Sequence, residues 1–573
     1  MPRSEPDPTL AGLATEAWDA YLTANPTVAT AIGDRRFDDR LPPNREADEA
    51  ALHARLVELL DRALAAASRE LTEPDRVTAS ALVQTLSAEL ARRESGVDAW
   101  TVDPLEGPQV AFMALESYQP AATPAEGAAM VARWAAMGPW LDRHVERLRV
   151  SLADGLVSPG SPVVRTLAEI EALLASPTEA WPLLRPAASE RPGWGPEERS
   201  RFADGLLAAA ALGLRPALER YRAFLADELL PRARSDDRPG LVHLPGGGEA
   251  YASLARSHTS LELSPEEIHA IGLAESERID AELAELSARV LGTAGLHEAL
   301  RRLRGDPGLH FSTPEEIVDV ARSSLARAVE AVPAWFGTVP QAPCEVVEIP
   351  AYEAEHTTIA YYREPAAEGS RPGQFFINAT EPTTRPRYEA EALAFHESVP
   401  GHHLQIAIAQ ERPLPAFRRF GGTTAFIEGW GLYSERLADE MGLYSADLDR
   451  IGVLSFDGWR ASRLVVDTGM HALGWSRAEA IDFMTRHTAL ASNNIANEVD
   501  RYITWPGQAL AYKLGQLELL RLRDVARDRL GAAFDIRDFH DTVLHEGALP
   551  LRTLARVVEA WLDRAEGAAT DPR

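Results

Sequence analysis

The residues best suited to chemistry lie close together in one stretch, AFHESVPGHHLQ, at residues 394–405. It holds a His-Glu pair, His396 and Glu397, and a His-His pair, His402 and His403. Imidazole nitrogens bind divalent metal ions, and a carboxylate beside them can act as a general base toward water. The stretch therefore predicts a metal site that carries its own base.

The spacing departs from the His-Glu-x-x-His pattern, in which two histidines one turn apart share a helix face and bind zinc. Pro400 stands where the second histidine would be, and Gly401 follows it. On a regular helix, His402 would point to the wrong side and His403 would lie roughly 10 Å along the axis from His396. We expect the Pro-Gly pair to widen or kink the helix so that His402 comes beside His396. The alternative is a kinked helix with two surface imidazoles.

A site with two histidines needs a third protein ligand, and a glutamate from a neighbouring helix commonly supplies it. The stretch TTAFIEGWGLYSE, residues 423–435, offers Glu428 for this role and Glu435 two turns later. Glu435 could instead accept a hydrogen bond from a ligand histidine. A glutamate on a helix is usually solvated, but the neighbouring His-Glu stretch favours ligation by Glu428. The sequence leaves open whether His402 or His403 is the second ligand.

Two downstream stretches add candidates. Arg460, Arg463 and His471 recur at helical spacing on one stripe. They predict either an ion-pair ladder or a cationic wall near the substrate, with His471 as a transition-state donor. Tyr502 and the Tyr512-Lys513 pair flank a Pro-Gly turn, and a tyrosine hydroxyl aimed at a developing oxyanion is a common electrophilic aid. The alternative for the tyrosines is aromatic packing at a helix N-terminus.

The elements that must position these residues are mainly helical. Apolar residues recur at helical spacing through the first part of the chain, and Ser264 begins a helix with Pro265 at its first position. We expect a helical N-terminal region, 1–335, and a catalytic region, 336–573, which carries the metal site. Strand-like segments precede the His-Glu helix and predict a small sheet beside it: 344–350, 357–362 and 373–380. The sheet edge could bind an extended peptide by strand addition, or the sheet could merely cover the core.

Composition limits the function classes. The formal net charge is −28, from 86 acidic and 58 basic residues, which argues against binding to nucleic acid or to anionic membranes. Cys344 is the only cysteine, so no intrachain disulfide forms and a reducing compartment is expected. We find no N-terminal apolar leader and no run long enough to span a bilayer. The expected location is the cytoplasm.

Three motifs carry a family resemblance: HESVPGHH at 396–403, EGWGLY at 428–433 and RYITWPGQA at 501–509. Together with the segment 26–33 and the glycine-rich turn before Tyr251, they resemble the bacterial domain of unknown function 885 family (DUF885). The resemblance covers nearly the whole chain. That family in turn resembles the gluzincin side of the zinc metallopeptidases, especially mainly helical peptidases whose active cleft runs between two helical halves.

The resemblance implies a mainly α, gluzincin-like fold with a deep cleft and one zinc ion. It implies His396, His402 and Glu428 as ligands, and Glu397 as the base. The expected activity is zinc-dependent hydrolysis of a peptide or amide bond in a peptide or small amide substrate, with Tyr502 or His471 stabilising the oxyanion. Substrate contacts or outer contacts of the metal site are expected from the remaining candidates: His403, Glu435, Arg460, Arg463, Tyr512 and Lys513.

Two alternatives to this function stay open. The same machinery could hydrolyse a non-peptide amide or an ester. A different class is a noncatalytic helical binding protein that kept the cleft and lost the metal. Glu397 argues against that class, because a binding cleft has no use for a base beside metal ligands. The arginine stripe is consistent with a carboxylate-bearing substrate.

Overall fold

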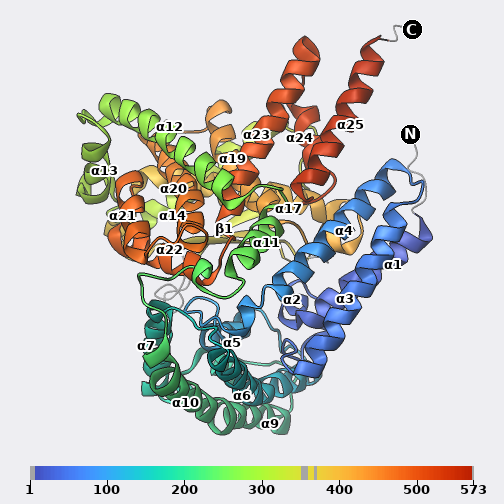
Figure 1. The fold of residues 1–573 in the computed structure, drawn as a ribbon, viewed down its shortest axis with the longest axis vertical. Coiled ribbons are helices and arrows are strands. Elements are labelled where there is room, and N and C mark those ends of the chain that lie inside the picture. The colour runs from blue at the N-terminus through green and yellow to red at the C-terminus, as the bar shows by residue number, and fades with distance from the viewer. Residues whose placement is uncertain (1–6, 350–358, 367–368, 370, 571–573) are drawn as a thin grey trace.

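The protein is described here by a computed structural model, which covers residues 7–349, 359–366, 369 and 371–570. Its architecture is mainly helical with one small sheet, as the sequence predicts (Figure 1). Over the described residues, we find no helix that combines the length and the apolar character needed to cross a bilayer. The expected deep cleft between two helical halves stays a prediction.

The first helices form an arm along one side of the molecule (Figure 1). They are α1 (Pro8–Ala24), α2 (Pro26–Ala31), α3 (Glu46–Ala67) and α4 (Glu73–Glu94). The Asp7 carboxylate caps α1 by accepting the backbone N–H groups of Thr9 and Leu10, and the apolar face behind it is buried. The arm also reaches the C-terminal end of the chain, since the hydroxyls of Ser80 and Thr553 lie 2.8 Å apart.

The next helices build a second body with its own core, coloured teal to green in Figure 1. They are α5 (Pro108–Ala114), α6 (Pro124–Ala153), α7 (Gly160–Ala175), α8 (Arg185–Ala188), α9 (Pro196–Ala208) and α10 (Arg215–Ala223). From α9 to Leu229 the helical path is continuous but irregular. Two π-helical segments, Ala209–Leu214 and Phe224–Leu229, interrupt its α-helical turns.

The chain then returns to the upper half through α11 (Gly247–Thr259), α12 (Pro265–Leu291), α13 (Leu296–Gly305) and α14 (Pro314–Ala331). The Ser264 hydroxyl accepts from the backbone of Glu267, and the Glu267 side chain accepts from Ser264, so the expected capping device is present. α12 lies along α20 (Asp447–His471) at close range. Gly272 permits this approach, because a Cβ there would lie 2.7 Å from the Leu464 side chain.

The predicted sheet is present and has three strands, β1 (Cys344–Glu348), β2 (Ala360–Arg363) and β3 (Gly373–Ile377). Its order is β1-β3-β2, with β1 parallel and β2 antiparallel to β3. Two of the predicted strands extend beyond the described residues: Pro350 at the end of the first and residues 357–358 at the start of the second lie outside them. β2 contacts α16 (Ala390–Glu397), so the sheet lies beside the His-Glu helix as expected.

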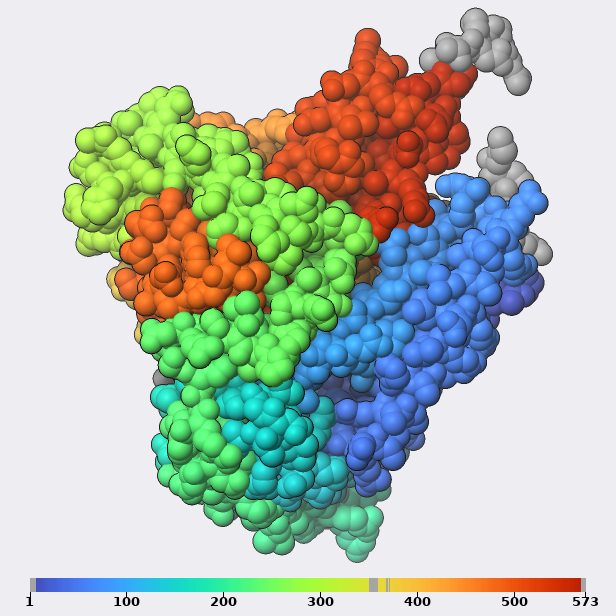
Figure 2. Space-filling view, in the orientation of Figure 1, coloured from blue at the N-terminus to red at the C-terminus, as the bar shows by residue number. Residues whose placement is uncertain are grey.

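The C-terminal part surrounds that helix. Its helices are α17 (His402–Glu411), α18 (Ala416–Arg419), α19 (Thr424–Glu440), α20, α21 (Arg477–His487), α22 (Ser492–Thr504), α23 (Leu510–Leu530), α24 (Ile536–Leu544) and α25 (Leu551–Thr570). Figure 2 shows the red C-terminal helices lying against the blue N-terminal arm. One hydrophobic core contains residues from both sides of position 335, such as Leu325 and Phe395. The division into two regions at that position stays a prediction.

Candidate metal centre

The His-Glu stretch is a broken helix. α16 ends at Glu397, and α17 begins at His402 after a turn that contains a cis Val399–Pro400 peptide bond. Gly401 is packed against α16, since a Cβ there would lie 1.9 Å from the His396 carbonyl oxygen. The interruption at Pro-Gly was expected, although the result is two helices and not one widened helix. It brings the rings of His396 and His402 to a centroid distance of 4.6 Å.

Glu428 of α19 faces both imidazoles. Its Oε2 lies 3.7 Å from His396 Nε2 and 3.6 Å from His402 Nε2. These separations are too long for direct hydrogen bonds. Zinc ligands about 2.1 Å from the ion at tetrahedral angles are themselves about 3.4 Å apart. The three side chains therefore fit a shared metal ion, and they form the group of possible ligands found among the described residues.

The predicted outer contact of Glu435 is also present. His396 Nδ1 donates to Glu435 Oε1 at 2.8 Å, so Nε2 is left to face Glu428. Burial alone would lower the pKa of His396, but the two carboxylates outweigh it and raise that pKa to about 10. Burial would raise the pKa of Glu428, yet the two imidazoles hold it well below its usual range. In the metal-free protein, the cluster therefore favours positive charge between its carboxylates.

Two glycines shape the space around these ligands. A Cβ at Gly431 would lie 2.6 Å from the His396 ring, so only glycine at this position lets α19 approach the imidazole. A Cβ at Gly373 would lie 2.4 Å from His403 Nδ1. Sequence reasoning missed both positions, although the small residues of EGWGLY are typical of close helix packing.

Glu397 is the last residue of α16 and is half-buried. Its carboxylate makes no hydrogen bond or ion pair with the part of the chain that the structure describes. It is the direct neighbour of one candidate ligand in the chain, and no described partner occupies it. With respect to the described residues, its carboxylate therefore remains a candidate for the predicted base.

His403 has a different role from His402. Its Nε2 donates to the Ala342 carbonyl oxygen at 3.0 Å, and its Nδ1 accepts from the Tyr362 hydroxyl at 2.9 Å. Burial lowers the pKa of His403 to about 4, so the ring is neutral. His402 therefore lies beside Glu428, whereas the hydrogen bond from Tyr362 of β2 to His403 joins α17 to the sheet. Neither ring nitrogen of His403 is left for a substrate.

The two expected oxyanion donors, His471 and Tyr502, both make internal hydrogen bonds. His471 is fully buried, accepts from the Leu241 N–H at 3.2 Å and donates to the Tyr502 carbonyl at 2.9 Å. The Tyr502 hydroxyl is also occupied: it donates to Glu498 at 2.5 Å and accepts from Arg463 Nε at 2.9 Å. In this structure their protons serve internal hydrogen bonds, and the expected donor roles stay predictions.

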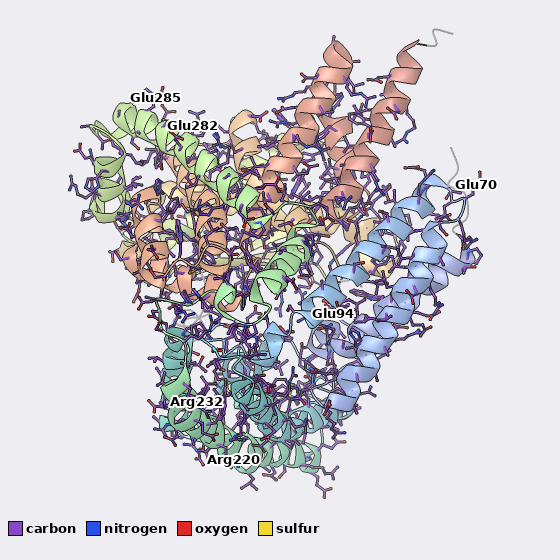
Figure 3. The ribbon with its side chains drawn as sticks, viewed as in Figure 1. Glu70, Glu94, Arg220, Arg232, Glu282 and Glu285 are labelled. Carbon is purple, nitrogen blue, oxygen red and sulfur yellow. The ribbon has the colours of Figure 1, made fainter. Side chains whose placement is uncertain are left out.

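Lys513 likewise makes internal hydrogen bonds. Its ammonium group is 1% exposed and donates to Asp457 at 2.5 Å and to Gln516 at 2.7 Å. Asp457 also accepts from Arg436, which donates to Glu282 at 3.2 Å. Figure 3 labels Glu282 on α12, so this network ties α12 to α20 and α23. No contact of Lys513 with the candidate ligands is found among the described residues, and its expected role at the site stays a prediction.

The other candidates, Arg460, Arg463 and Tyr512, lie together. The guanidinium carbons of Arg460 and Arg463 lie 4.2 and 4.6 Å from the Trp459 ring centroid, and that of Arg463 lies 4.2 Å from the Tyr512 ring centroid. Glu498 joins this group through Arg463 and was missed. Its position four residues before Tyr502, on the same helix face, was the available signal.

The model of the bacterial protein family of unknown function DUF885 matches residues 26–558, and the chain therefore belongs to this family. A crystal structure from Colwellia psychrerythraea, titled "putative lipoprotein", has 27% identity and a TM-score of 0.87, and covers 97% of this chain and 99% of its own. A "putative lipoprotein of unknown function" from Shewanella oneidensis, at 17% identity and a TM-score of 0.74, covers 96% and 99% and shares the fold. No curated protein matches.

Proposed function

We propose that this member of the DUF885 family is a zinc-dependent hydrolase that cleaves a peptide or amide bond. The observation that carries the proposal is the approach of His396 Nε2 and His402 Nε2 to one oxygen of Glu428, at 3.7 and 3.6 Å. Two imidazoles, one carboxylate and an open position are the usual ligand set of a catalytic zinc. The hydrogen bond from His396 to Glu435 adds the outer support that such ligands commonly have.

In this proposal, three residues bind the metal ion and a fourth acts as the general base. His396, His402 and Glu428 would hold the ion. When bound, zinc would supply Lewis acidity toward a carbonyl oxygen and lower the pKa of water. Glu397, which has no described partner, would accept the proton of the attacking water and deliver it to the nitrogen of the leaving amine. A metal site without catalysis would not require that free carboxylate.

The oxyanion donor in this proposal is Tyr512. Its hydroxyl accepts from Arg501 Nη2 at 3.4 Å, and its own proton goes to none of the described residues. Tyr512 lies on α23 one turn before Gly515, which crosses α19 at Gly429, directly after Glu428. A Cβ at Gly515 would lie 2.8 Å from the Gly429 Cα. Tyr512 therefore lies on the helix that packs against α19 next to Glu428.

The test compares two isosteric variants. Purified protein should contain about one zinc per chain, and a mixed peptide library should be cleaved with zinc and not after chelation. Glu397→Gln should retain zinc and lose at least about 10²-fold in turnover, because an amide cannot take a proton. Glu428→Gln should lose zinc itself, because a neutral amide replaces an anionic ligand. His396→Ala should abolish zinc binding.

Two results would reject the proposal. One is a protein that folds and does not retain zinc when zinc is supplied. The other is a zinc-loaded Glu397→Gln variant with the turnover of the parent, which would remove the general base. Peptide mass spectrometry of the library, with metal analysis of the same samples, measures both.

A further inference from the structure

Three arginines, two of them buried, lie together around α20 and have few carboxylate partners among the described residues. Arg460 and Arg463 lie on α20, and Arg501 lies near the end of α22. Arg463 Nη2 donates to Glu498 Oε2 at 2.9 Å, and Arg501 Nη1 lies 3.6 Å from the other oxygen of Glu498. Two of these guanidinium groups therefore share one carboxylate, and Arg460 bonds to none among the described residues.

Several of their N–H groups have no acceptor. Buried nitrogens without a hydrogen-bond partner in the described chain are Arg460 Nε and Nη1, Arg463 Nη1 and Arg501 Nε. Arg460 is 5% exposed and Arg463 is 2% exposed. Arg436, in contrast, donates to both Asp457 and Glu282. Burying guanidinium groups without acceptors is costly, so an arrangement of this kind indicates that an anion completes it.

Two helices around this group pack against the helices that carry metal ligands. On one side, α20, which carries Arg460 and Arg463, packs against α16, the helix that carries His396. On the other side, Arg463 and Arg501 contact Tyr512, which lies one turn before the crossing of α23 with α19 beside Glu428. An anion bound by the arginines would therefore lie beside α20 and α23, two helices that pack against those of the metal ligands.

We infer that Arg460, Arg463 and Arg501 bind a carboxylate of the peptide substrate, close to the bond that is cleaved. A planar guanidinium matches a carboxylate with two parallel hydrogen bonds, and the stacked rings of Trp459 and Tyr512 hold the guanidinium planes in place. The inference rests on the proposed hydrolysis for its biological meaning. It restricts cleavage to peptides that carry a carboxylate beside the scissile bond, such as the free C-terminus of a short peptide.

The experiment uses the zinc-loaded full chain and three matched peptides. They end in free Ala, in amidated Ala, and in amidated Asp. The enzyme should cleave the free-acid peptide with a kcat/KM about 10- to 100-fold above that of amidated Ala, the usual effect of hydrogen bonds to a charged group. If amidated Asp is also cleaved well, the carboxylate comes from a side chain. If it is not, the carboxylate is the C-terminal one.

A variant then assigns the effect to the arginines. Arg460→Met keeps the apolar stem and breaks no described hydrogen bond, so it should fold and retain zinc. It should lower kcat/KM for the free-acid peptide about 10- to 100-fold more than for its amide. Arg191→Gln is the matched control, because Arg191 also stacks on two rings, Trp194 and Phe202, but in the other half of the chain. It should leave the preference unchanged.

A binding measurement separates this inference from the proposed activity. Calorimetry with succinate and with its uncharged diamide reports carboxylate binding whether or not any peptide is cleaved. Binding of succinate alone, lost in Arg460→Met, supports the inference even if hydrolysis is absent. Equal cleavage of free and amidated peptides, or equal calorimetric signals for succinate and the diamide, would overturn it.

Discussion

At the residue scale, the carboxylates of the candidate centre differ by what already occupies them. Glu428 faces two imidazoles, Glu435 accepts from His396, and Glu397 has no described partner. Glu498 is held by Tyr502 and Arg463. The same side chain can therefore serve as ligand, orienting acceptor, base or structural partner, and its neighbours decide which.

The Glu435 contact leads to the first prediction. Glu435→Gln keeps an acceptor for His396 Nδ1 but removes the charge that makes Nε2 a stronger ligand, so zinc affinity should fall about 10- to 100-fold. Competition with a coloured chelator measures the affinity. Glu391→Gln is the control, because Glu391 is also buried on α16 but bonds to Arg327 and Ser445. An unchanged zinc affinity in the Glu435 variant would remove its orienting role.

The two tyrosines give a second contrast. Tyr502→Phe removes a hydroxyl bonded to Glu498, Arg463 and Trp459, and leaves buried polar groups unpaired. It should lower the free energy of unfolding by about 1–3 kcal/mol. Tyr512→Phe should instead lower turnover by about 10²-fold with little change in stability, as loss of an oxyanion donor does. Denaturant unfolding and steady-state kinetics on both variants measure these effects, and the reverse pattern would return the donor role to Tyr502.

At the element scale, the site depends on how closely α19 approaches α16. Gly431→Ala places a methyl group 2.6 Å from the His396 ring, so zinc affinity should fall sharply even though alanine favours helix formation. Gly12→Ala on α1 is the control, because a Cβ there meets no atom within 4 Å. That variant should retain zinc and gain up to about 1 kcal/mol in stability. Zinc retained at parent affinity by Gly431→Ala would show that α19 can shift without disturbing the ligand.

The sequence predicted what depends on local chemistry. Helical periodicity, the Ser264 cap and the strand-like segments gave the mainly helical fold and the small sheet. The Pro-Gly pair predicted the interruption that brings His402 to His396. Both follow from backbone preferences and side-chain type, which a single sequence contains.

The sequence could not predict which protons are already used. Tyr502 and His471 have the right chemistry for an oxyanion donor. Partners distant in the chain occupy the His471 ring, whereas the Tyr502 proton goes to Glu498, four residues earlier. Lys513 meets Asp457, 56 residues away, across a helix interface. Such pairings arise only when helices pack, so residue type and spacing did not distinguish these groups from Tyr512.

At the scale of the whole molecule, buried polar contacts hold distant segments together. His540 of α24 donates from Nδ1 to the Trp335 carbonyl at 2.8 Å, and its Nε2 accepts from the Tyr433 hydroxyl at 2.8 Å. One neutral imidazole thereby joins α24, α19 and the turn after α14. Its protonation would remove the acceptor for Tyr433 and place a charge in the core.

This contact predicts a pH effect. Burial lowers the pKa of His540 from an ordinary 6.5 to about 3. Because the folded protein binds fewer protons at this group than the unfolded chain, the stability it contributes is present above pH 6.5 and is lost as pH falls toward 3. Between pH 7 and pH 5, the loss should be about 2 kcal/mol. His540→Gln lacks this titrating group. The difference in free energy of unfolding between parent and variant should therefore be smaller at pH 5 than at pH 7 by that amount.

Comparison between variants is required because other buried groups act in the opposite direction. Burial raises the pKa of Glu389 and of Asp467 to about 7, so acidification favours the folded state at those carboxyls. These contributions are common to parent and variant and cancel in the difference. Urea unfolding at pH 7 and pH 5 measures the difference in the free energy of unfolding between parent and variant. His297→Gln, at an exposed histidine, is the control, and its difference from the parent should be the same at both pH values. If the difference for His540→Gln is also the same at both pH values, His540 can be protonated in the folded protein without a loss of stability, and the prediction is wrong.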